Sequence, residues 1–343
     1  MHRTTGHPQA SPVLAFFARG RRGRAGAAWA VLAALLCACT APTTTMTAPP
    51  APPLHALPGG FTEHRWPAAD GQTVQVLERA ERAAPLRYRV IVIPGSGCAG
   101  MGAVAERYFA GLLHAQVLVL HKPGVAPWAR TAPGDCAPDF VQADALSTWA
   151  AHARAALRAD AARHPGGPQV PQWLVGISEG GELLPTLAPE VPRLAGLVLL
   201  ASSGLDPLEA GTLQARRQGA LAPWQAVGRA QASARADTAV VQGRSLRYWR
   251  DLWHWPLAAP LIAGPWPLLQ VWGADDELVP AVAYERFAAQ AASRSAPYCP
   301  RSLPGADHGL QRPGHDGVQQ VWGWLEQWAR RPQAGPCAEG ETP

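Results

Sequence analysis

The chain has little charge and almost no lysine. Charged residues make up only 16% of its 343 residues, and Lys122 is the single lysine among 30 basic residues. We interpret this preference for arginine as a bias of composition without chemical meaning. Because 48% of the residues are hydrophobic, the chain can bury a sizeable core, which excludes wholesale disorder. Its length fits one large domain or two small ones.

A basic surface is also lacking from most of the chain. The first 24 residues contain five arginines and no acidic residue, and the remainder contains 25 basic and 25 acidic residues. A nucleic-acid-binding protein needs a basic stripe on its folded part, so we expect no nucleic-acid partner. The sequence has neither a CxxC pair nor a His-x3-His spacing, which argues against a structural zinc site. We therefore expect no metal and no cofactor.

The N-terminal segment is typical of an export signal. Arginines within 19–24 precede an apolar run over 25–38, which at about 14 residues is too short to span a bilayer. The letters LCAC at 36–39 resemble a bacterial lipobox, which implies lipidation of Cys39, a membrane anchor and a periplasmic location. A cleaved signal peptide without lipid, or an uncleaved anchor, is the alternative.

Composition divides the chain into four parts. Residues 1–38 are the predicted signal peptide of the lipoprotein type. Residues 39–60 are rich in Pro and Thr and lack charge, so we expect an extended tether there. Residues 61–331 are expected to form one domain, and 332–343 a C-terminal tail.

From residue 61 onward, apolar runs alternate with helical patterns. Short continuous runs of this kind are typical of strands buried on both faces of a parallel sheet. Helical spacing predicts a helix over 140–164 and a last helix over 318–328. The alternation predicts an α/β fold with a doubly wound, mainly parallel sheet. The five strand-like runs are 89–93, 117–120, 173–177, 197–200 and 268–272.

One segment, about 205–265, breaks this alternation. It lacks a strong strand signal and is too long for a plain connection, so it predicts a helical insertion. Trp249 and Trp253 are four positions apart and would share one face of a helix. That face would either line an apolar pocket or pack in the core of the insertion.

The letters GISEGG at 176–181 contain the pattern G-x-S-x-G around Ser178. The serine follows an apolar run and precedes a plausible helix start at 182–184, which is the strand–turn–helix setting of a nucleophile elbow. Such a tight turn requires small neighbours, and the glycines provide them. A solvated serine in a glycine-rich turn is the alternative.

A serine nucleophile needs a base, and the base needs an orienting acid. Asp276 lies in the segment GADDELVP after the fifth run, and His308 lies 32 residues later in the small-residue turn GADHG. The order serine, acid, histidine therefore predicts a catalytic triad. Asp275 and Glu277 are alternatives for the acid, and His315 is the alternative for the base.

An oxyanion hole requires two preorganised donors, each worth about 2.7–4 kcal/mol. The backbone N–H of Glu179 is one candidate, because it directly follows the nucleophile. The loop PGSGC at 94–98 follows the first strand run and should supply the other. We predict the N–H of Ser96, with Gly97 as the second choice.

Together these motifs resemble the α/β-hydrolase superfamily over roughly residues 70–331. The GSG loop and the GxSEGG elbow are similar to those of bacterial esterase-like members, some of which resemble thioesterases or dienelactone hydrolases. The resemblance implies an acid turn G-x-x-D-x-x-V-P, which lands on Asp276, and a helical cap at 205–265. Two departures concern the subfamily and the substrate: Pro94 replaces a common histidine, and HKPG at 121–124 replaces an acidic turn.

Four cysteines follow the signal segment, and an even set in an exported protein indicates disulfides. Three pairings are possible, of which we favour Cys98–Cys136 and Cys299–Cys337. The first pair belongs to the active-site edge of the sheet, and the second would hold the C-terminal tail.

The sequence thus predicts an exported serine hydrolase that cleaves a small-molecule carboxylic ester through an acyl-enzyme intermediate. A peptidase, an amidase or a thioesterase would use the same triad. A non-catalytic envelope scaffold of the same fold is the remaining alternative, although a scaffold has no use for a complete triad.

Overall fold

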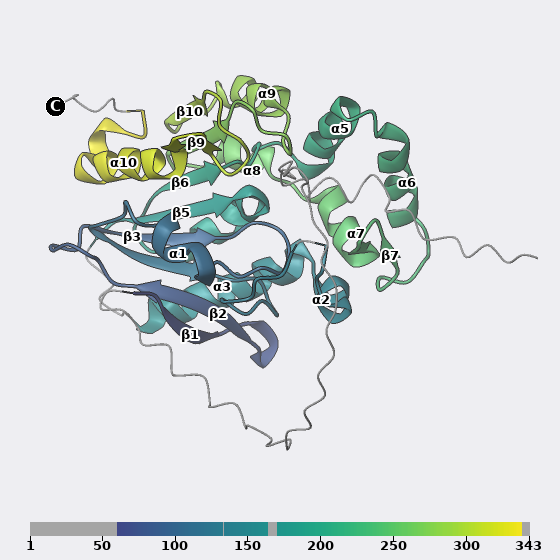
Figure 1. The fold of residues 1–343 in the computed structure, drawn as a ribbon, viewed down its shortest axis with the longest axis horizontal. Helices are drawn as coiled ribbons and strands as arrows, with labels where there is room; N and C mark the ends of the chain where they lie inside the picture. The colour runs from purple at the N-terminus through teal and green to yellow at the C-terminus, as the bar shows by residue number, and fades with distance from the viewer. Residues whose placement is uncertain (1–59, 133, 164–169, 338–343) are drawn as a thin grey trace, which may run out of the picture.

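The structure is a computed structural model that describes residues 60–132, 134–163 and 170–337. An eight-stranded sheet runs through the molecule, with helices on both sides (Figure 1). The predicted signal peptide, Cys39 and the tether up to residue 59 lie outside the described residues, as does the end of the tail from 338.

All five predicted strands are present, and they form the parallel centre of the sheet. Every residue of β3 (Tyr88–Ile93) is buried, as expected for a strand that is covered on both faces. The α/β class with a mainly parallel, doubly wound sheet is confirmed. The other four strands are β4 (Ala115–Leu120), β5 (Gln172–Ile177), β6 (Leu194–Leu200) and β9 (Leu268–Gly273).

Three strands that the apolar runs do not predict extend the sheet at its edges. β1 (Thr62–Pro67) and β2 (Thr73–Arg79) pair antiparallel with each other, and β2 continues antiparallel onto β4. β10 (Tyr298–Leu303) pairs parallel with β9 at the opposite edge. The strand order is β1-β2-β4-β3-β5-β6-β9-β10. Only one residue of β1 is buried, so no continuous apolar run marks it.

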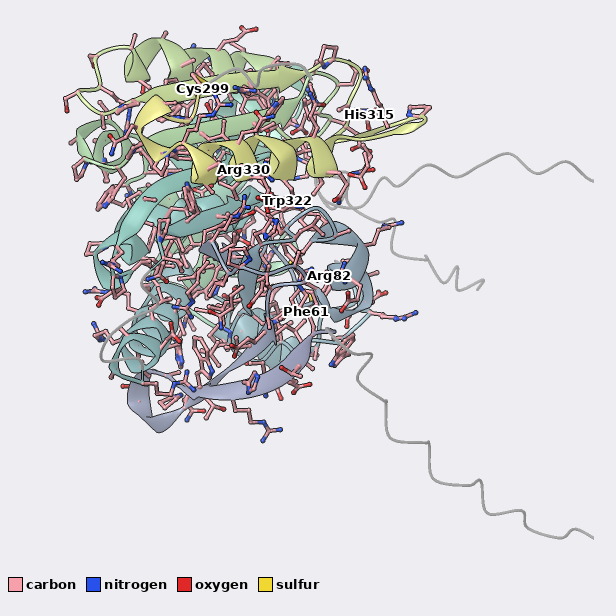
Figure 2. The ribbon with its side chains drawn as sticks, turned by 90° about the vertical axis from the view of Figure 1, so that its left-hand side faces the viewer. Phe61, Arg82, Cys299, His315, Trp322 and Arg330 are labelled. Atoms are coloured by element: carbon pink, nitrogen blue, oxygen red, sulfur yellow. A yellow bond between two sulfur atoms is a disulfide. The ribbon has the colours of Figure 1, made fainter. Side chains whose placement is uncertain are left out.

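Helices bury both faces of the sheet. On one face lie α1 (Gly102–Tyr108) and α10 (Gly317–Arg330), the predicted last helix. Trp322 of α10 packs 5.8 Å from the Phe109 ring, and its indole N–H donates to the carbonyl of Tyr108 at 2.6 Å (Figure 2). The opposite face is covered by α3 (Leu146–Arg163), α4 (Leu184–Leu187) and α9 (Ala281–Ala291).

The prediction of one helix over 140–164 is wrong, because the helix is interrupted. α2 (Pro138–Ala143) ends before Asp144, whose backbone is extended with φ −64° and ψ 123°, and α3 begins at Leu146. The Asp144 carboxylate is buried and takes part in ion pairs described below. The break therefore places a charged group that a continuous helix would direct elsewhere.

The insertion at 205–265 gathers beyond the carboxyl ends of the parallel strands (Figure 1). It is helical, as predicted, except for one short hairpin. A separate hydrophobic cluster forms its core, centred on Trp224, Tyr248 and Trp249. Its elements are α5 (Pro207–Arg217), α6 (Leu221–Gln231), β7 (Val240–Val241), β8 (Arg244–Ser245), α7 (Leu246–His254) and α8 (Ala258–Ala263).

A carboxylate joins the two ends of this insertion. One oxygen of Asp206, just before α5, accepts hydrogen bonds from the backbone N–H of Leu257 at 2.7 Å and of Ala258 at 2.9 Å. Residues that are about 50 positions apart in the sequence are thus tied together where the insertion leaves the sheet.

Two disulfides join Cys98 to Cys136 and Cys299 to Cys337, which is the pairing favoured from the sequence. The second attaches the C-terminal tail to β10. Within the described ranges, no helix has the length and apolar character needed to cross a bilayer. The remaining short elements are η2 (Ala69–Gly71), η4 (Ala188–Glu190), β11 (Gln311–Arg312), β12 (His315–Asp316) and η5 (Pro332–Ala334).

Candidate active site

Ser178 lies at a sharp turn between β5 and a 3-10 segment, η3 (Ser178–Leu183). Its φ of 51° falls in the left-handed region, which residues other than glycine rarely adopt. The turn brings backbone so close to Gly176 and Gly180 that a side chain at either position would clash. A Cβ on Gly176 would lie 2.5 Å from the Cα of Gly181, and one on Gly180 would lie 2.1 Å from the carbonyl oxygen of Ile93.

The structure brings the three residues of the predicted triad together. His308 Nε2 lies 3.1 Å from Ser178 Oγ, and His308 Nδ1 lies 2.8 Å from Asp276 Oδ2. With its proton on Nδ1, the imidazole donates to the carboxylate and accepts from the serine hydroxyl. The His308 side chain is 23% exposed and that of Asp276 only 2%, so the acid is buried while the base faces the pocket.

The carboxylate of Asp276 is held by four donors. Its Oδ1 accepts the backbone N–H of Leu278 at 2.8 Å and of Val279 at 2.9 Å, and its Oδ2 accepts the Tyr284 hydroxyl at 2.8 Å in addition to His308. Burial alone would raise the pKa of Asp276, but these hydrogen bonds, with that of His308 foremost, lower the pKa below its ordinary value. The group is therefore suited to remain an anion beside an imidazolium.

The alternative acids and the alternative base lie elsewhere. Asp275 and Glu277 are exposed on either side of the buried Asp276. His315 belongs to the hairpin of β11 and β12, which directly precedes α10, and its Nε2 hydrogen-bonds to Gln320 at 2.9 Å (Figure 2).

The loop after β3 reaches the serine, as the oxyanion prediction requires. A Cβ on Gly95 would lie 3.4 Å from the Cβ of Ser178, and Ser96 lines the same pocket as the serine, whereas Gly97 does not. Among the described residues no acceptor engages the N–H of Ser96. Glu179 is the second residue of η3, and its backbone N–H belongs to the first turn, where amides have no acceptor within the helix. The assignment of these two amides to an oxyanion hole stays a prediction.

A cavity of about 450 Å³ lies next to Ser178 and His308. Trp224, Tyr248 and Trp249 from the insertion form part of its wall, and the same three residues belong to the core of the insertion. Trp249 thus both packs in the core of the insertion and lines the cavity, and its role in binding substrate stays a prediction. Trp253 does not line the cavity and packs on Trp224 instead, with ring centroids 4.6 Å apart. The sequence pattern missed Trp224, because it lies on a different helix.

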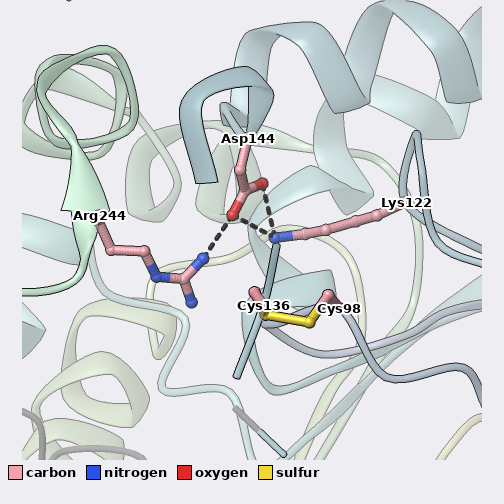
Figure 3. Close-up of a disulfide and its surroundings, with 5 residues drawn as sticks. All are labelled: Cys98, Lys122, Cys136, Asp144 and Arg244. Carbon is pink, nitrogen blue, oxygen red and sulfur yellow. Dashed lines mark hydrogen bonds and ion pairs between the residues drawn. A yellow bond between two sulfur atoms is a disulfide. The ribbon is translucent and has the colours of Figure 1, made fainter. Parts of the chain in front are cut away.

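A buried network of charges connects the elbow to the insertion, and Figure 3 shows the part of it formed by Lys122, Asp144 and Arg244. Lys122 Nζ lies 2.9 Å from Glu179 Oε2 and 3.0 Å from Asp144 Oδ1, and the Asp144 carboxylate also pairs with Arg244 of β8. Only 3% of the Lys122 side chain is exposed. The sequence pattern missed these ion pairs, because nothing in the composition distinguishes Lys122 from a surface lysine. The Cys98–Cys136 disulfide lies close to the network (Figure 3).

The two carboxylates of this network respond differently to burial. Burial raises the pKa of Asp144 despite the neighbouring Lys122. Burial also acts to raise the pKa of Glu179, but the Lys122 and Arg244 charges outweigh it, so that the pKa is lowered. Glu179 is thereby held as an anion directly after the nucleophile.

Metal-ligating side chains do not gather at the site or elsewhere in the part of the chain that the structure describes: no three His, Cys, Asp or Glu residues are placed to hold an ion.

No family model and no curated protein sequence matches the chain. Among solved structures, it is similar to a puromycin-hydrolyzing peptidase of Mycobacterium tuberculosis (17% identity, TM-score 0.52) and to an acylaminoacyl peptidase of Pyrococcus horikoshii (10%, 0.53). It covers 41% and 43% of those chains, and 82% of this chain is aligned in each case. It is also similar to TT1662 of Thermus thermophilus, at 18% identity and a TM-score of 0.51, covering 98% of that chain and 78% of this one. At such identities the likeness shows the fold alone, that of α/β-hydrolases.

Proposed function

We propose that this protein is a serine hydrolase that cleaves a carboxylic ester through an acyl-enzyme intermediate. The observation that carries the proposal is the continuous contact from Ser178 through His308 to Asp276, at 3.1 and 2.8 Å, at the wall of a cavity. A binding module of the same fold has no need for a serine, an imidazole and a buried carboxylate in this order.

In the proposed mechanism each group has one role. Ser178 Oγ attacks the ester carbonyl carbon while His308 Nε2 accepts its proton, and Asp276 stabilises the resulting imidazolium. The amides of Ser96 and Glu179 donate to the carbonyl oxygen as it becomes an oxyanion. His308 then protonates the departing alkoxide. Water enters, loses a proton to His308 and attacks the acyl carbon. The bond from the acyl carbon to Ser178 Oγ then breaks, and Ser178 Oγ takes the proton back from His308, which frees the acid and restores the enzyme.

The bond that is cleaved is tested by comparing leaving groups on one acyl chain. Two of the similar structures are described as peptidases, so an amide is the competing bond, with a thioester third. We expect a fluorophosphonate probe to label the wild type but not Ser178→Ala, and nitrophenyl esters to be cleaved faster than the matched anilide and thioester. If the anilide is cleaved faster than the ester, the protein is an amidase and the proposed esterase activity is wrong. Absence of labelling in an otherwise folded protein would contradict the serine mechanism.

We also propose the organisation of the exported protein: a lipid on Cys39, a tether up to residue 60, and a hydrolase domain over 61–331. The two disulfides support an oxidising compartment. The wild type is expected to partition into detergent, and Cys39→Ser to be released or left unprocessed. A water-soluble wild-type protein whose N-terminus lies beyond Cys39 would favour simple secretion.

A further inference from the structure

The cavity next to the triad contains one acidic side chain that the proposed mechanism does not use. Glu182 lies four residues after Ser178 in η3 and lines the same cavity. Its Oε2 is buried and, within the described residues, has no hydrogen-bond partner and belongs to no ion pair. Because a buried polar atom without a partner is costly to leave unsatisfied, this carboxyl group at the wall of a cavity is a candidate for pairing with a ligand.

Both charged groups that act on Glu182 are acidic, and Arg244, which lines the same cavity, pairs with Asp144. Glu179 and Asp206 are the charged groups that act on it, and together with burial they raise the pKa of Glu182 well above its ordinary value, burial contributing most. Each of these neighbours already has its own partner: Lys122 pairs with Glu179, and backbone amides engage Asp206. The nearby positive charge is thus directed at other carboxylates, and the position of Glu182 favours a cation that comes from outside the chain.

Other residues that line the cavity carry oxygen atoms that can accept hydrogen bonds from a cation. The Oε1 atoms of Gln214 and Gln242 are buried acceptors without a partner among the described residues. The amide nitrogen of Gln214 already donates to the carbonyl of Glu277 at 2.8 Å, which leaves its oxygen for another donor. Trp224 and Trp249 also line the cavity, and aromatic rings attract cations that approach their faces. An ammonium group, with three donors and no acceptor, matches this lining better than a hydroxyl group does.

We propose that Glu182 forms a subsite for a protonated amine of the substrate, so that the hydrolase acts on esters that carry an ammonium group. This inference rests on the proposed function and specifies its substrate class. When the ammonium enters, the Glu182 carboxyl loses its proton to solvent, and the resulting carboxylate pairs with the substrate cation. No bond other than this O–H bond is broken in the step.

The test compares matched esters with and without the amine. One arm places it in the acyl group, with nitrophenyl esters of alanine against propionate and of 6-aminohexanoate against hexanoate. The other arm places it in the alcohol, with aminoethyl against propyl esters. We expect the wild type to favour the amine-bearing member of one arm by at least about tenfold in kcat/KM, as a charge-assisted contact provides. Glu182→Gln should lose most of that ratio.

Glu285→Gln, a substitution of an exposed glutamate on α9, is the matched control and should keep both the activity and the ratio. A ratio near one in the wild type, or an equal ratio in Glu182→Gln, overturns the amine subsite while the serine hydrolase stands. A second measurement does not depend on the folding of a variant: calorimetry on the wild-type protein should show hexylamine binding at least about tenfold more tightly than hexanol. Equal binding also overturns the subsite. Failure to cleave any ester, together with selective binding of hexylamine, would instead reject the esterase and keep the subsite.

Discussion

His308 Nε2 lies 3.1 Å from Ser178 Oγ, although 130 residues separate the two in the sequence. They meet because β5 ends directly before Ser178, while the loop that carries His308 follows β10, and both strands run parallel in one sheet. The carboxyl ends of parallel strands lie at the same edge, which is where ligands bind in open α/β sheets. The fold itself thus brings the nucleophile and the base together.

Removing the nucleophile or the base should abolish turnover without unfolding the protein. We expect Ser178→Ala and His308→Ala each to lower kcat by about 10⁴-fold or more, and Asp276→Asn by about 10⁴-fold, because the imidazole would then adopt the wrong tautomer. Steady-state kinetics on a nitrophenyl ester measures the effect, and circular dichroism checks the fold. Full activity in Ser178→Ala would end the serine mechanism.

The two tryptophans of α7 should respond differently to truncation. Trp249 is buried in the core of the insertion and also lines the cavity, so Trp249→Ala should cost about 3–5 kcal/mol of unfolding free energy and shift the preferred acyl-chain length. Trp253 packs on Trp224 outside the cavity lining. Trp253→Ala should therefore lower stability by less and leave the preference unchanged. A series of esters of increasing acyl-chain length measures the preference, and thermal melts measure the stability. An unchanged chain-length preference in Trp249→Ala would refute a role of Trp249 in the pocket.

Replacing the single lysine should be unusually damaging. Lys122→Met leaves the carboxylates of Asp144 and Glu179 buried without it, and removal of one partner from a buried pair costs about 3–5 kcal/mol. The matched control is Arg82→Met, which removes the half-exposed pair with Glu106 and should cost less than about 1 kcal/mol. Urea denaturation compares the two. Equal losses would show that the buried network contributes no more than a surface pair.

The two disulfides enclose loops of equal length but should differ in their effect on activity. Each spans 38 positions, for which chain entropy predicts about 4 kcal/mol of stabilisation. Replacing Cys98 and Cys136 with serine should also lower kcat, because Cys98 closely follows Ser96 of the oxyanion loop. Replacing Cys299 and Cys337 should lower only the melting temperature. Equal kcat values in the two double variants would argue that the oxyanion loop does not depend on its disulfide.

Glu182 should make the folded state less stable as the pH rises. Its pKa is raised on folding, so between its ordinary value of about 4.5 and the higher folded value the unfolded chain has released the proton while the native state keeps it. The free energy of unfolding then falls with rising pH over this window. Glu182→Gln cannot titrate, so the stability of the wild type relative to this variant should decline from about pH 4 upward. Denaturation at several pH values, with Glu285→Gln as the control, measures it, and a constant difference contradicts the prediction.

Local patterns were sufficient for the centre of the fold and for the triad. The five inner strands are short apolar runs, and the three catalytic candidates lie in turns whose small residues mark them. The edge strand β1 escapes this approach because five of its six residues are exposed. The ion pairs of Lys122 escape it because they join residues 22 and 57 positions apart, and only the folded chain brings those together.

The carboxylate of Asp206, which fastens the backbone of Leu257 and Ala258, makes the segment between them a closed module. This module has its own small core around Trp224 and Trp249. It is therefore suited to replacement by another segment of similar length, joined at the same two positions, to change the substrate preference. A graft that omits Arg244 would leave Asp144 without its partner from the insertion. A functional replacement segment must therefore supply both the arginine that pairs with Asp144 and the residues that line the cavity.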